Sequence, residues 1–577
     1  MNKTTLLFFL LSFSIYAQDS DWSWAKGYEN LNAGTITGSF MDNQKNIYQI
    51  GSFSSTSVTI GETVIANSSE APANPNVKYM DAYISKHDSE GNLLFVKHFT
   101  GSKFENLTSI AYDNNNSFYV TGHYNGNITI GNSTYEATDN MTKSFLAKLD
   151  LNGNVIWSKP LNFSGSTLLK FKDNNLYMAG IHSGDTYSID NLTTPSVGYT
   201  AVVNNMDKIF VAKLDLSGNA IWLKSSTYTG TASISDFHRL GTQIKGLAID
   251  NLGNVYVAGV IFSRSSTFGS ITITKTVTNN NSNLFITKYD NAGNVAWANT
   301  APTNSSANSV VSDLATDSNN NIYLLGYIYS SATNFGGVSL NFPSNYGSFL
   351  VKYATNGSVL WAKSGKLATD AQPSTGLGYN FFDRMYIDSA NNVYVTGVFA
   401  NYINFGNNIT FQTNNWTPNL FSIKYDSSGN ASDYYKITEA IISRYPIILD
   451  ITGDVFYYSG QVSDSNFVLG NTTISNPTTN PFTFIAKRDK RLSIEEHSGN
   501  NFTIYPNPSQ EQIYVSGLDS AENKIFSVFD MTGKKIKSLE FTNNDTIAID
   551  VKDLASGTYV LKIENGTIQK NIKFVKN

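Results

Sequence analysis

The segment DNLGNVYVAG at residues 250–259 and the segment FITKYDNAGNVAW at residues 285–297 are the clearest copies of a pattern that recurs along most of the chain. Both alternate apolar and polar residues and place Asp, Asn and Gly at their turns, as short antiparallel β-strands do. The hexad that ends in glycine recurs as NIYQIG at 46–51, SFYVTG at 117–122, NLYMAG at 175–180, NIYLLG at 321–326, NVYVTG at 392–397 and, more loosely, VFYYSG at 455–460. Such a repeat predicts an array of similar β-sheets.

Each repeat contains signals for four strands, which we denote A to D in chain order. An apolar segment ending in Asp precedes the hexad and forms strand A, and the hexad itself forms strand B. An alternating segment such as FLAKLD at 145–150 forms strand C, and a Gly-Asn turn then leads into strand D, as in GNVIW at 153–157. We expect each unit to be a four-stranded antiparallel meander.

The two ends of the array complement each other. The last unit ends with FIAKRD at 484–489 and has no D strand, whereas WSWAK at 22–26 precedes the first A strand and is similar to WAK at 361–363. We therefore predict that residues 22–26 pair with residues 484–489, because an open array would leave unpaired strand edges. The expected fold class is all-β: a seven-bladed β-propeller of four-stranded blades closed by the N-terminal strand, plus a small C-terminal β-sandwich.

The repeats resemble a known family of bacterial surface proteins. In the SBBP-type β-propeller repeat, D-x-x-G-N-x-Y-V-x-G alternates with F-x-x-K-Y-D-x-x-G-N-x-x-W, and residues 250–259 and 285–297 are the closest copies here. The resemblance covers about residues 21–490. The third unit departs from it, since Asp173 stands four residues before Tyr177 instead of six, which leaves the form of its A–B turn open.

A second resemblance lies at the C-terminus. The segments YPNP at 505–508, FSVFDMTGKKI at 526–536, SGTYVLKI at 556–563 and KNIKFVK at 570–576 resemble the type A sorting domain of the type IX secretion system. The resemblance implies a small β-sandwich that the type IX secretion machinery recognises at the outer membrane. It also implies that this domain is usually cleaved, with the cargo released or attached to surface lipopolysaccharide.

The N-terminus is typical of a cleavable secretory signal peptide, with Lys3, an apolar run over residues 6–15, and Ala17 before Gln18 as the expected cleavage point. That run is too short to cross a hydrocarbon core of about 30 Å as a helix, and we expect no transmembrane segment. The expected organisation is a signal peptide at 1–17, a propeller at 18–490, a linker at 491–501 and a sorting domain at 502–577. The expected location is secreted or on the outer cell surface.

Composition excludes several functions. The 577-residue chain has a net charge of −5, which argues against nucleic acid as a partner. It contains no cysteine, so disulfides, thiolate nucleophiles and cysteine-based zinc sites are excluded. The turn residues Asp150, Asn152 and Asn154 could offer oxygens to calcium, but turn formation is the better interpretation. We assign no catalytic residue and expect no metal and no cofactor.

Two features suggest where a ligand would bind. The B–C and D–A connections vary in length and leave the same end of each sheet, and variable loops on a rigid frame commonly carry function. Polar residues also interrupt the repeat in or just before the A strands, which would line a central channel: His238, Arg239, Lys245, Asp313, Asp383, Arg384 and Arg444. These residues either solvate a wet channel or form a ligand pocket, with arginines binding a carboxylate and Asp313 or Asp383 binding hydroxyls.

Repeated and exposed aromatic residues have structural and functional interpretations. The strand-D tryptophans Trp157, Trp222, Trp297 and Trp361 are expected to pack between blades, since they occupy equivalent positions. The strand-C lysines, Lys148, Lys213, Lys288 and Lys352, are expected on the polar side of an outer strand. Tyr346, Tyr402 and Trp416 either offer a stacking surface for sugars or support their loops.

The leading hypothesis is a non-enzymatic binding module that recognises a glycan, a peptide or another surface protein. One alternative is a secreted glycan-cleaving hydrolase or lyase with a site at the channel mouth, for which Arg384 and Arg444 are candidates. The other alternative is a structural adhesin in which the ring is only a spacer. The expected partners are the type IX secretion machinery, through residues 502–577, and an extracellular ligand that the sequence does not identify.

Overall fold

The computed structural model describes residues 22–28, 35–69, 79–138, 142–163, 165, 167–182, 186–195, 208–227, 243–261, 265–274, 282–301, 309–342, 346–365, 380–406, 409–412, 419–437, 442–452, 455–462, 466–469, 472–475, 482–489, 503–516, 524–531, 533–541, 546–565 and 568–577. The chain divides into two compact units, which we call the repeat unit (Met1–Asp489) and the C-terminal unit (Lys490–Asn577). The described residues contain strands and no helix, which confirms the all-β class. The predicted signal peptide at 1–17 and linker at 491–501 lie outside the described residues.

The described part of the repeat unit contains one meander after another along the chain. Six of its sheets have four strands, and the sheet that contains β2 has six because a hairpin adds to it. We number these sheets in chain order and give the strands from A to D. Sheet 1 is β2 (Thr35–Met41), β3 (Ile47–Phe53), β6 (Asp81–His87) and β7 (Leu93–Gly101); sheet 2 is β8 (Phe104–Tyr112), β9 (Ser117–Asn125), β12 (Lys143–Asp150) and β13 (Val155–Leu161); sheet 3 is β14 (Thr167–Lys172), β15 (Asn175–His182), β18 (Lys208–Leu214) and β19 (Ala220–Ser225); sheet 4 is β20 (Gln243–Ile249), β21 (Val255–Ile261), β24 (Asn283–Tyr289) and β25 (Val295–Ala301). Sheet 5 is β26 (Ser309–Thr316), β27 (Ile322–Ile328), β30 (Gly347–Tyr353) and β31 (Val359–Gly365); sheet 6 is β32 (Phe381–Ile387), β33 (Val393–Phe399), β36 (Asn419–Tyr425) and β37 (Ala431–Ile437); sheet 7 is β38 (Ile442–Thr452), β39 (Val455–Val462), β42 (Phe482–Asp489) and β1 (Trp22–Tyr28).

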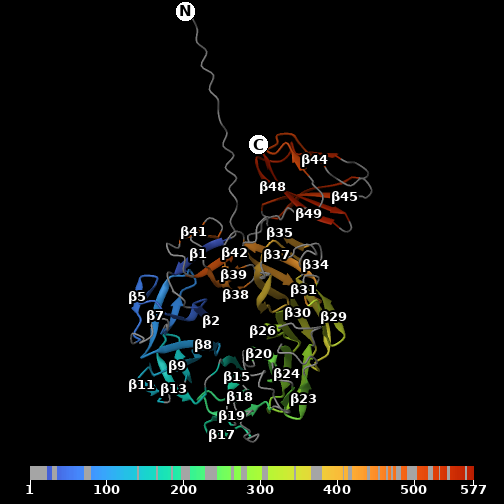
Figure 1. The fold of residues 1–577 in the computed structure, drawn as a ribbon. Helices are drawn as coiled ribbons and strands as arrows, with labels where there is room; N and C mark the ends of the chain where they lie inside the picture. The colour runs from blue at the N-terminus through green and yellow to red at the C-terminus, as the bar shows by residue number, and fades with distance from the viewer. Residues whose placement is uncertain are drawn as a thin grey trace, which may run out of the picture. The chain divides into compact units, whose positions relative to one another are not determined.

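The B–C connection of every one of these sheets contains a short hairpin. The hairpins are β4 (Ser57–Ile60) with β5 (Thr63–Ala66), β10 (Asn127–Ile130) with β11 (Ser133–Glu136), β16 (Ser188–Ile189) with β17 (Leu192–Thr193), β22 (Ser265–Phe268) with β23 (Ile271–Thr274), β28 (Ala332–Phe335) with β29 (Val338–Asn341), β34 (Tyr402–Gly406) with β35 (Ile409–Gln412), and β40 (Asn466–Leu469) with β41 (Thr472–Ser475). In Figure 1 the labelled strands β5, β11, β17, β23 and β29 lie at the periphery of the repeat unit.

Strand β1 pairs antiparallel with β42, with Trp24 opposite Lys487 and Ala25 opposite Ala486. This is the pairing that the sequence predicts between residues 22–26 and residues 484–489. The A strands contact one another in sequence order, from β2 through β8, β14, β20, β26 and β32 to β38, and β38 also contacts β2. Figure 1 shows the labelled A strands β2, β8, β20, β26 and β38 around the centre of the unit.

The core of the repeat unit lies between neighbouring sheets. Tyr256 and Ala258 of sheet 4, for example, form one buried cluster with Leu324 and Phe349 of sheet 5. The B strands are buried along their whole length in sheets 1, 4 and 6, because each is covered by a sheet on both faces. Near-continuous apolar hexads are what such two-sided burial requires.

Aspartate side chains build many of the A–B and C–D turns. At the A–B turn of sheet 4, Asp250 Oδ1 accepts the backbone N–H of Leu252 and of Asn254, each at 2.9 Å, and Oδ2 accepts the Tyr256 hydroxyl at 2.9 Å. At the C–D turn of sheet 2, Asp150 Oδ1 accepts the N–H of Asn154 at 2.8 Å. These bonds support the turn interpretation of the repeated Asp and Asn residues.

The unusual third unit has a shorter turn of a different type. Asp173 and Asn174 have φ of 47° and 57°, and the flanking residues Lys172 and Asn175 pair directly across the hairpin. Two consecutive residues in the left-handed region are typical of a type I′ turn, which joins strands with a two-residue loop. The missing residues therefore shorten the A–B turn and leave the four-stranded sheet intact.

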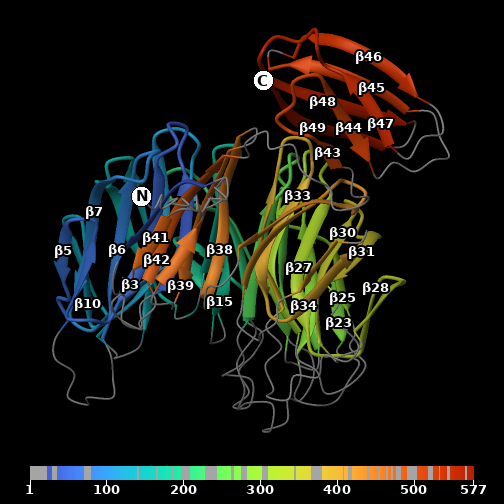
Figure 2. The same cartoon turned by 90° about the horizontal axis from the view of Figure 1, so that it is seen from above.

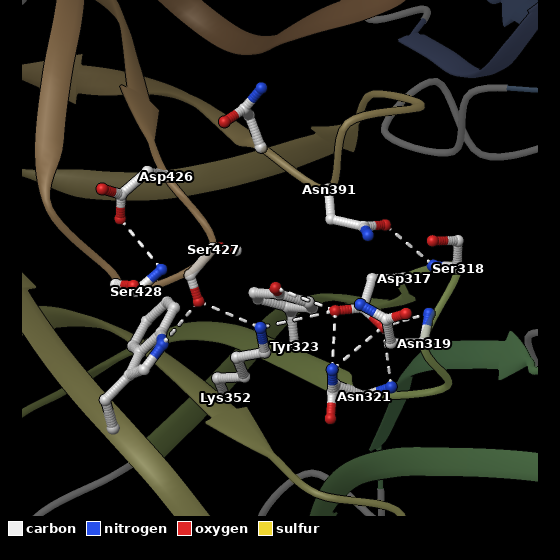
Figure 3. Close-up of polar contacts among 12 residues, drawn as sticks. Asp317, Ser318, Asn319, Asn321, Tyr323, Lys352, Asn391, Asp426, Ser427 and Ser428 are labelled. Atoms are coloured by element: carbon white, nitrogen blue, oxygen red, sulfur yellow. Dashed lines mark hydrogen bonds and ion pairs between the residues drawn. The ribbon is translucent and has the colours of Figure 1, made fainter.

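Lysines of strand C and tryptophans of strand D link several sheets to the next, as Lys352 does between sheets 5 and 6 (Figure 3). The Lys352 ammonium lies 3.4 Å from Asp317 Oδ2 and donates a hydrogen bond to the Ser427 carbonyl of sheet 6 at 3.0 Å. The Trp361 indole N–H donates to the same carbonyl at 3.2 Å. Lys352 is nearly buried, so the prediction that the strand-C lysines only face solvent on an outer strand is wrong for this residue.

The same link recurs between sheets 4 and 5. Lys288 and Trp297 of sheet 4 both donate to the Thr355 carbonyl of sheet 5, each at 3.0 Å. Trp222 of sheet 3 donates to the Asn291 carbonyl of sheet 4 at 3.0 Å. The predicted packing of these tryptophans between sheets is confirmed, and hydrogen bonds to the neighbouring C–D turn add to it.

The C-terminal unit is a two-sheet sandwich (Figure 2). One sheet contains β43 (Thr503–Tyr505), β44 (Gln512–Ser516) and β47 (Thr546–Asp550), and the other contains β46 (Lys535–Phe541), β45 (Lys524–Asp530), β48 (Gly557–Asn565) and β49 (Ile568–Lys576). Ile513 and Ile549 from the first sheet share a buried cluster with Phe526, Leu561 and Phe574 from the second. Tyr559, Leu561 and Ile563 alternate along β48 and face this cluster, so β48 is a half-buried strand.

Candidate functional site

The A strands of sheets 1, 2, 4, 5 and 6 each contain a β-bulge near their start. The pairing with strand B skips one residue in each of them: Thr37, Thr108, Lys245, Ser312 and Asp383. A bulge leaves its extra residue without a ladder partner and redirects the neighbouring side chains. We call these five positions together the bulge level. We treat it as the candidate site because two of the five, Lys245 and Asp383, are predicted ligand residues.

The bulges show which predicted residues are equivalent. Lys245, Ser312 and Asp383 occupy the same bulge position in sheets 4, 5 and 6. Asp313 and Arg384 occupy the next position, opposite the fifth residue of the hexad in each sheet. Charged residues therefore occur at these two adjacent positions in sheets 4, 5 and 6, whereas sheets 1 and 2 have threonine, glycine or serine there.

Asp313 joins two neighbouring A strands. Its Oδ1 accepts the N–H of Leu314 at 2.8 Å on β26, and its Oδ2 accepts the N–H of Met385 at 3.0 Å on β32. The bulges on these two strands interrupt the regular ladder of backbone hydrogen bonds. The Asp313 carboxylate gives the two N–H groups an acceptor. The Asp313 carboxylate positions β32 against β26, which differs from the direct ligand contact that the sequence suggests.

Arg384 is anchored to the same pair of strands. Its Nη1 donates to the Ser312 carbonyl at 2.9 Å and to the Asp383 carbonyl at 3.1 Å, and lies 3.6 Å from Asp383 Oδ1. The side chains of Arg384 and Asp383 keep 29% and 17% of their surface exposed. A guanidinium and a carboxylate held in place and reached by solvent can donate to and accept from a polar ligand.

The structure brings together Asp313, Asp383 and Arg384, which we call the polar cluster. Lys245 is exposed on β20, the strand that contacts β26 on its other side. Arg444 lies on β38, beside β32, where its backbone pairs with Gln461. His238, Arg239 and Trp416 lie outside the described residues. Tyr346 is 6% exposed and donates to the Asn380 carbonyl at 3.0 Å, so loop support is the correct interpretation for this aromatic residue.

A buried acidic group between sheets 1 and 2 escapes the sequence analysis. Asp81 Oδ2 lies 2.6 Å from His98 Nε2 and accepts the Ser68 hydroxyl at 2.8 Å, and both Asp81 and Glu105 are fully buried. Burial raises the pKa of Glu105 to about 9, and the negative charge of Asp81 adds to this effect. Burial alone would raise the pKa of Asp81, but the hydrogen bonds from His98 and Ser68 bring it below its ordinary value.

No repeat signal marks this group, because its members come from strands β6, β7 and β8 and from the loop after β5. Two fully buried carboxyl groups cannot reach a ligand, so we assign them a structural role at the joint between the sheets. Among the described residues, no group of three or more histidine and acidic side chains is placed to hold a metal ion. The described residues also contain no helix of the length and apolarity needed to span a bilayer.

The C-terminal unit identifies the export route. Residues 503–577 match the family model of the secretion system C-terminal sorting domain. The predicted sorting domain is therefore present, and it directs the chain to secretion through the type IX system and to the outer cell surface. This match covers the C-terminal unit and does not assign a function to the repeat unit.

Other comparisons cover longer stretches of the chain. A segment of 181 residues is 25% identical to the uncharacterized WD repeat-containing protein L264 of Acanthamoeba polyphaga mimivirus, which covers 29% of this chain. The chain spans only 13% of the length of that curated relative. The match gives no activity or ligand for the repeat unit.

Among solved structures, an ulvan lyase of polysaccharide lyase family PL25 aligns with 10% identity and a TM-score of 0.31, over 70% of this chain and 87% of the lyase. A puromycin hydrolase aligns with 7% identity and a TM-score of 0.33, over 84% of this chain and 59% of the hydrolase. A structural genomics protein of unknown function from Bacteroides thetaiotaomicron VPI-5482 aligns with 10% identity and a TM-score of 0.26, over 80% of this chain and 100% of that chain. Scores this low carry no argument about activity.

Proposed function

We propose that this chain is an exported, closed seven-bladed β-propeller of SBBP-type repeats that binds an extracellular ligand at its bulge level. In this proposal residues 1–17 are a signal peptide cleaved before Gln18, and residues 491–501 link the propeller to the sorting domain. The observation that carries the binding role is the polar cluster, which holds a solvent-accessible carboxylate and guanidinium on two adjacent A strands.

Contacts of sheet 7 support ring closure. Asp450 on β38 accepts the Tyr386 hydroxyl of sheet 6 at 3.1 Å through Oδ1, and through Oδ2 it accepts the Lys45 ammonium of sheet 1 at 2.6 Å. One carboxylate thus links the last repeat to the first repeat and to the sixth. A ring closed in this way removes the exposed edges that an open array would leave.

The bulge level supports binding in preference to catalysis. Both oxygens of Asp313 accept backbone N–H groups, so this carboxylate is not available as a general acid or base partner of Asp383. Glycan hydrolysis ordinarily needs two carboxyl groups on either side of the scissile bond. The hydrolase alternative therefore needs a second carboxyl group besides Asp383.

Binding assays on the mature full-length chain test this proposal. The chain is applied to arrays of bacterial and algal glycans and of peptides, and each bound ligand is then analysed for cleavage products. We expect binding without turnover, and we expect Arg384→Ala to weaken it about tenfold or more, since charge-assisted hydrogen bonds contribute roughly 1.5–3 kcal/mol. Leu252→Ala is the matched control, because Leu252 is 64% exposed in an A–B turn at the opposite end of the sheets.

Arg384→Lys keeps the positive charge and shows whether the planar guanidinium is needed. The thermal unfolding temperature of each variant must match that of the wild type, so that lost binding reports on the site. Turnover that disappears in Arg384→Ala would favour the hydrolase or lyase alternative. The absence of any ligand on both arrays would favour the structural adhesin.

A further inference from the structure

Four aromatic rings meet between sheets 5 and 6, at the end from which the B–C and D–A connections leave. We call Tyr327, Tyr329, Tyr346 and Phe381 the aromatic cluster. The ring centroid of Tyr327 lies 4.8 Å from that of Phe381 and 5.9 Å from that of Tyr329. The centroid of Tyr346 lies 4.9 Å from Tyr329 and 5.7 Å from Phe381. These separations are those of edge-to-face and tilted aromatic pairs, so the rings form one packed group.

The base of the aromatic cluster is held firmly. Tyr346 is buried and donates through its hydroxyl to the Asn380 carbonyl. Asn380 is 1% exposed; its Oδ1 accepts the N–H of Ala400 at 2.9 Å and its Nδ2 donates to the Tyr402 carbonyl at 2.9 Å. Tyr329 lies at the top of the cluster, just after β27, with 41% of its surface exposed. A rigid base with one exposed ring loses little conformational entropy when a ligand packs on it.

The repeat frame does not require aromatic residues at these positions. Tyr327 follows the glycine of its hexad, where the other units have Ser52, His123, Ile181, Val260, Val398 and Gln461. Phe381 precedes the bulge residue by two positions, where the other bulged strands have Thr35, Asn106, Gln243 and Val310. Apart from the imidazole of His123, none of these equivalent residues has a ring, so the cluster of four rings is a local addition to one junction.

The aromatic cluster adjoins the polar cluster on the same strand. Phe381 is the first residue of β32, and Asp383 follows two residues later, roughly 7 Å along the strand at about 3.4 Å per residue. Asp383 and its neighbour Arg384 are both partly exposed. An exposed aromatic face, a carboxylate and a guanidinium thus occur together at one end of the junction between sheets 5 and 6.

We propose that the aromatic and polar clusters together bind neighbouring sugar units of a neutral carbohydrate chain, an inference that rests on the proposed binding function. The apolar C–H face of one sugar unit packs on Tyr329, while hydroxyls of a neighbouring unit donate to Asp383 and accept from Arg384. A neutral chain fits best, because the polar cluster offers a carboxylate beside a guanidinium, and these two groups together bind hydroxyls without requiring a charge on the ligand.

Isothermal titration calorimetry on the mature full-length chain tests the inference. The probes are hexasaccharides of β-1,4-linked glucose, β-1,3-linked glucose and β-1,4-linked mannose. We expect at least one to bind and Tyr329→Ala to weaken its binding about tenfold, since aromatic stacking contributes roughly 0.5–1.5 kcal/mol beyond the area it buries. Tyr329→Phe keeps the ring and should retain the affinity. Tyr434→Ala is the control, because Tyr434 is 52% exposed on β37, away from the cluster.

The possible outcomes separate this inference from the broader proposal. Hexasaccharide binding that is lost in Arg384→Ala but unchanged in Tyr329→Ala overturns the aromatic site and leaves the binding module standing. If no hexasaccharide binds while a peptide binds and requires Arg384, the carbohydrate inference is wrong and the binding module again stands. If neither class of ligand binds, both are overturned.

Discussion

The indole of Trp24 lies against the α-carbon of Gly91, so closely that a β-carbon added to Gly91 would lie 2.7 Å from Cζ3 of Trp24. Trp24 belongs to β1, at the start of the described chain, and Gly91 belongs to the C–D turn of sheet 1. The strand-D tryptophans of four other sheets lie in the same way over the C–D glycines of the sheets that follow them: Trp157 over Gly218, Trp222 over Gly293, Trp297 over Gly357 and Trp361 over Gly429. Trp24 therefore provides for sheet 7 the contact that strand D provides elsewhere.

The contact between Trp24 and Gly91 predicts that replacing Gly91 by alanine lowers the free energy of unfolding. Gly91 has φ of +74°, which costs a non-glycine residue roughly 1–2 kcal/mol, and overlap with the rigid indole adds about 1–3 kcal/mol. Gly406→Ala is the matched control, since Gly406 has φ of +84° and no atom within 4 Å of an added β-carbon. We expect Gly91→Ala to lower the urea midpoint of unfolding clearly more than Gly406→Ala does.

Adding Trp24→Ala to each glycine variant isolates the contact. With the indole removed, the two glycine substitutions should cost nearly the same free energy of unfolding, because the remaining neighbour of Gly91, Lys26 Cδ at 3.2 Å, belongs to a flexible side chain. Equal costs in the presence of Trp24 would contradict the contact and weaken the argument for ring closure.

A second prediction concerns the link between sheets 5 and 6. Lys352→Met removes the cation that faces the fully buried Asp317 and donates to the Ser427 carbonyl, and breaking a buried ion pair costs about 3–5 kcal/mol. Lys148→Met is the control, since Lys148 and Lys352 lie over their tyrosine rings at nearly equal distances of 5.1 Å and 5.0 Å. Chemical denaturation should show a large loss for the first variant and less than about 1 kcal/mol for the second. Similar losses would mean that the inter-sheet link contributes little.

The third prediction is a pH dependence of stability at the joint between sheets 1 and 2. Burial raises the pKa of Glu105 from its ordinary value of 4.5 to about 9, so the folded chain binds this proton more tightly than the unfolded chain. The stabilisation that this bound proton gives the folded chain is therefore complete below about pH 4.5. It decreases as the pH rises from about 4.5 to about 9, and it is lost above about pH 9. Glu105→Gln keeps a neutral, hydrogen-bonding side chain and removes the titration.

Thermal unfolding between pH 5 and pH 9 measures this effect. The wild type should lose stability toward pH 9 more steeply than Glu105→Gln. The difference between the two curves gives the contribution of Glu105, because Asp81 and His98 are present in both proteins. Glu136→Gln on the exposed edge of β11 should follow the wild type. Parallel curves for the wild type and Glu105→Gln would show that Glu105 is ionised in the folded chain.

The fourth prediction concerns export. Deletion of residues 503–577 should leave the repeat unit folded but retained in the periplasm, because the matched sorting domain is what the secretion machinery recognises. Phe574→Asp should have the same effect, since it places a charge in the core of the sandwich. Lys552→Ala alters an exposed side chain and should leave export unchanged. Cell fractionation measures each outcome, and export of the truncated chain would show that another segment carries the signal.

Much of the architecture could be predicted from the residues because it repeats. The hexads became the B strands, Asp and Asn became the turns, and the unmatched WSWAK segment became β1 beside β42. These features depend on local alternation, turn chemistry and the need to pair every edge. The inter-sheet role of Lys352 was missed, since its partners lie in a turn of the next sheet, far along the chain.

The candidate site was only partly predictable. Asp383 and Arg384 stood out as polar residues that interrupt an apolar strand, but the bulges that place them have no local signature, because a bulge is a register shift between two strands. The structural role of Asp313 also depends on a partner far along the chain, the N–H of Met385. The aromatic cluster likewise joins residues from different strands.

The sequence by itself determined the repeat, its turns, the export domain and the strand that completes the last sheet, since each follows from interactions between near neighbours or between matching ends. Only the tertiary structure decided that Tyr327, Tyr346 and Phe381 share one cluster beside Asp383. The physical reason is that contacts between sheets depend on how the sheets stack, and stacking brings together residues that no local pattern connects.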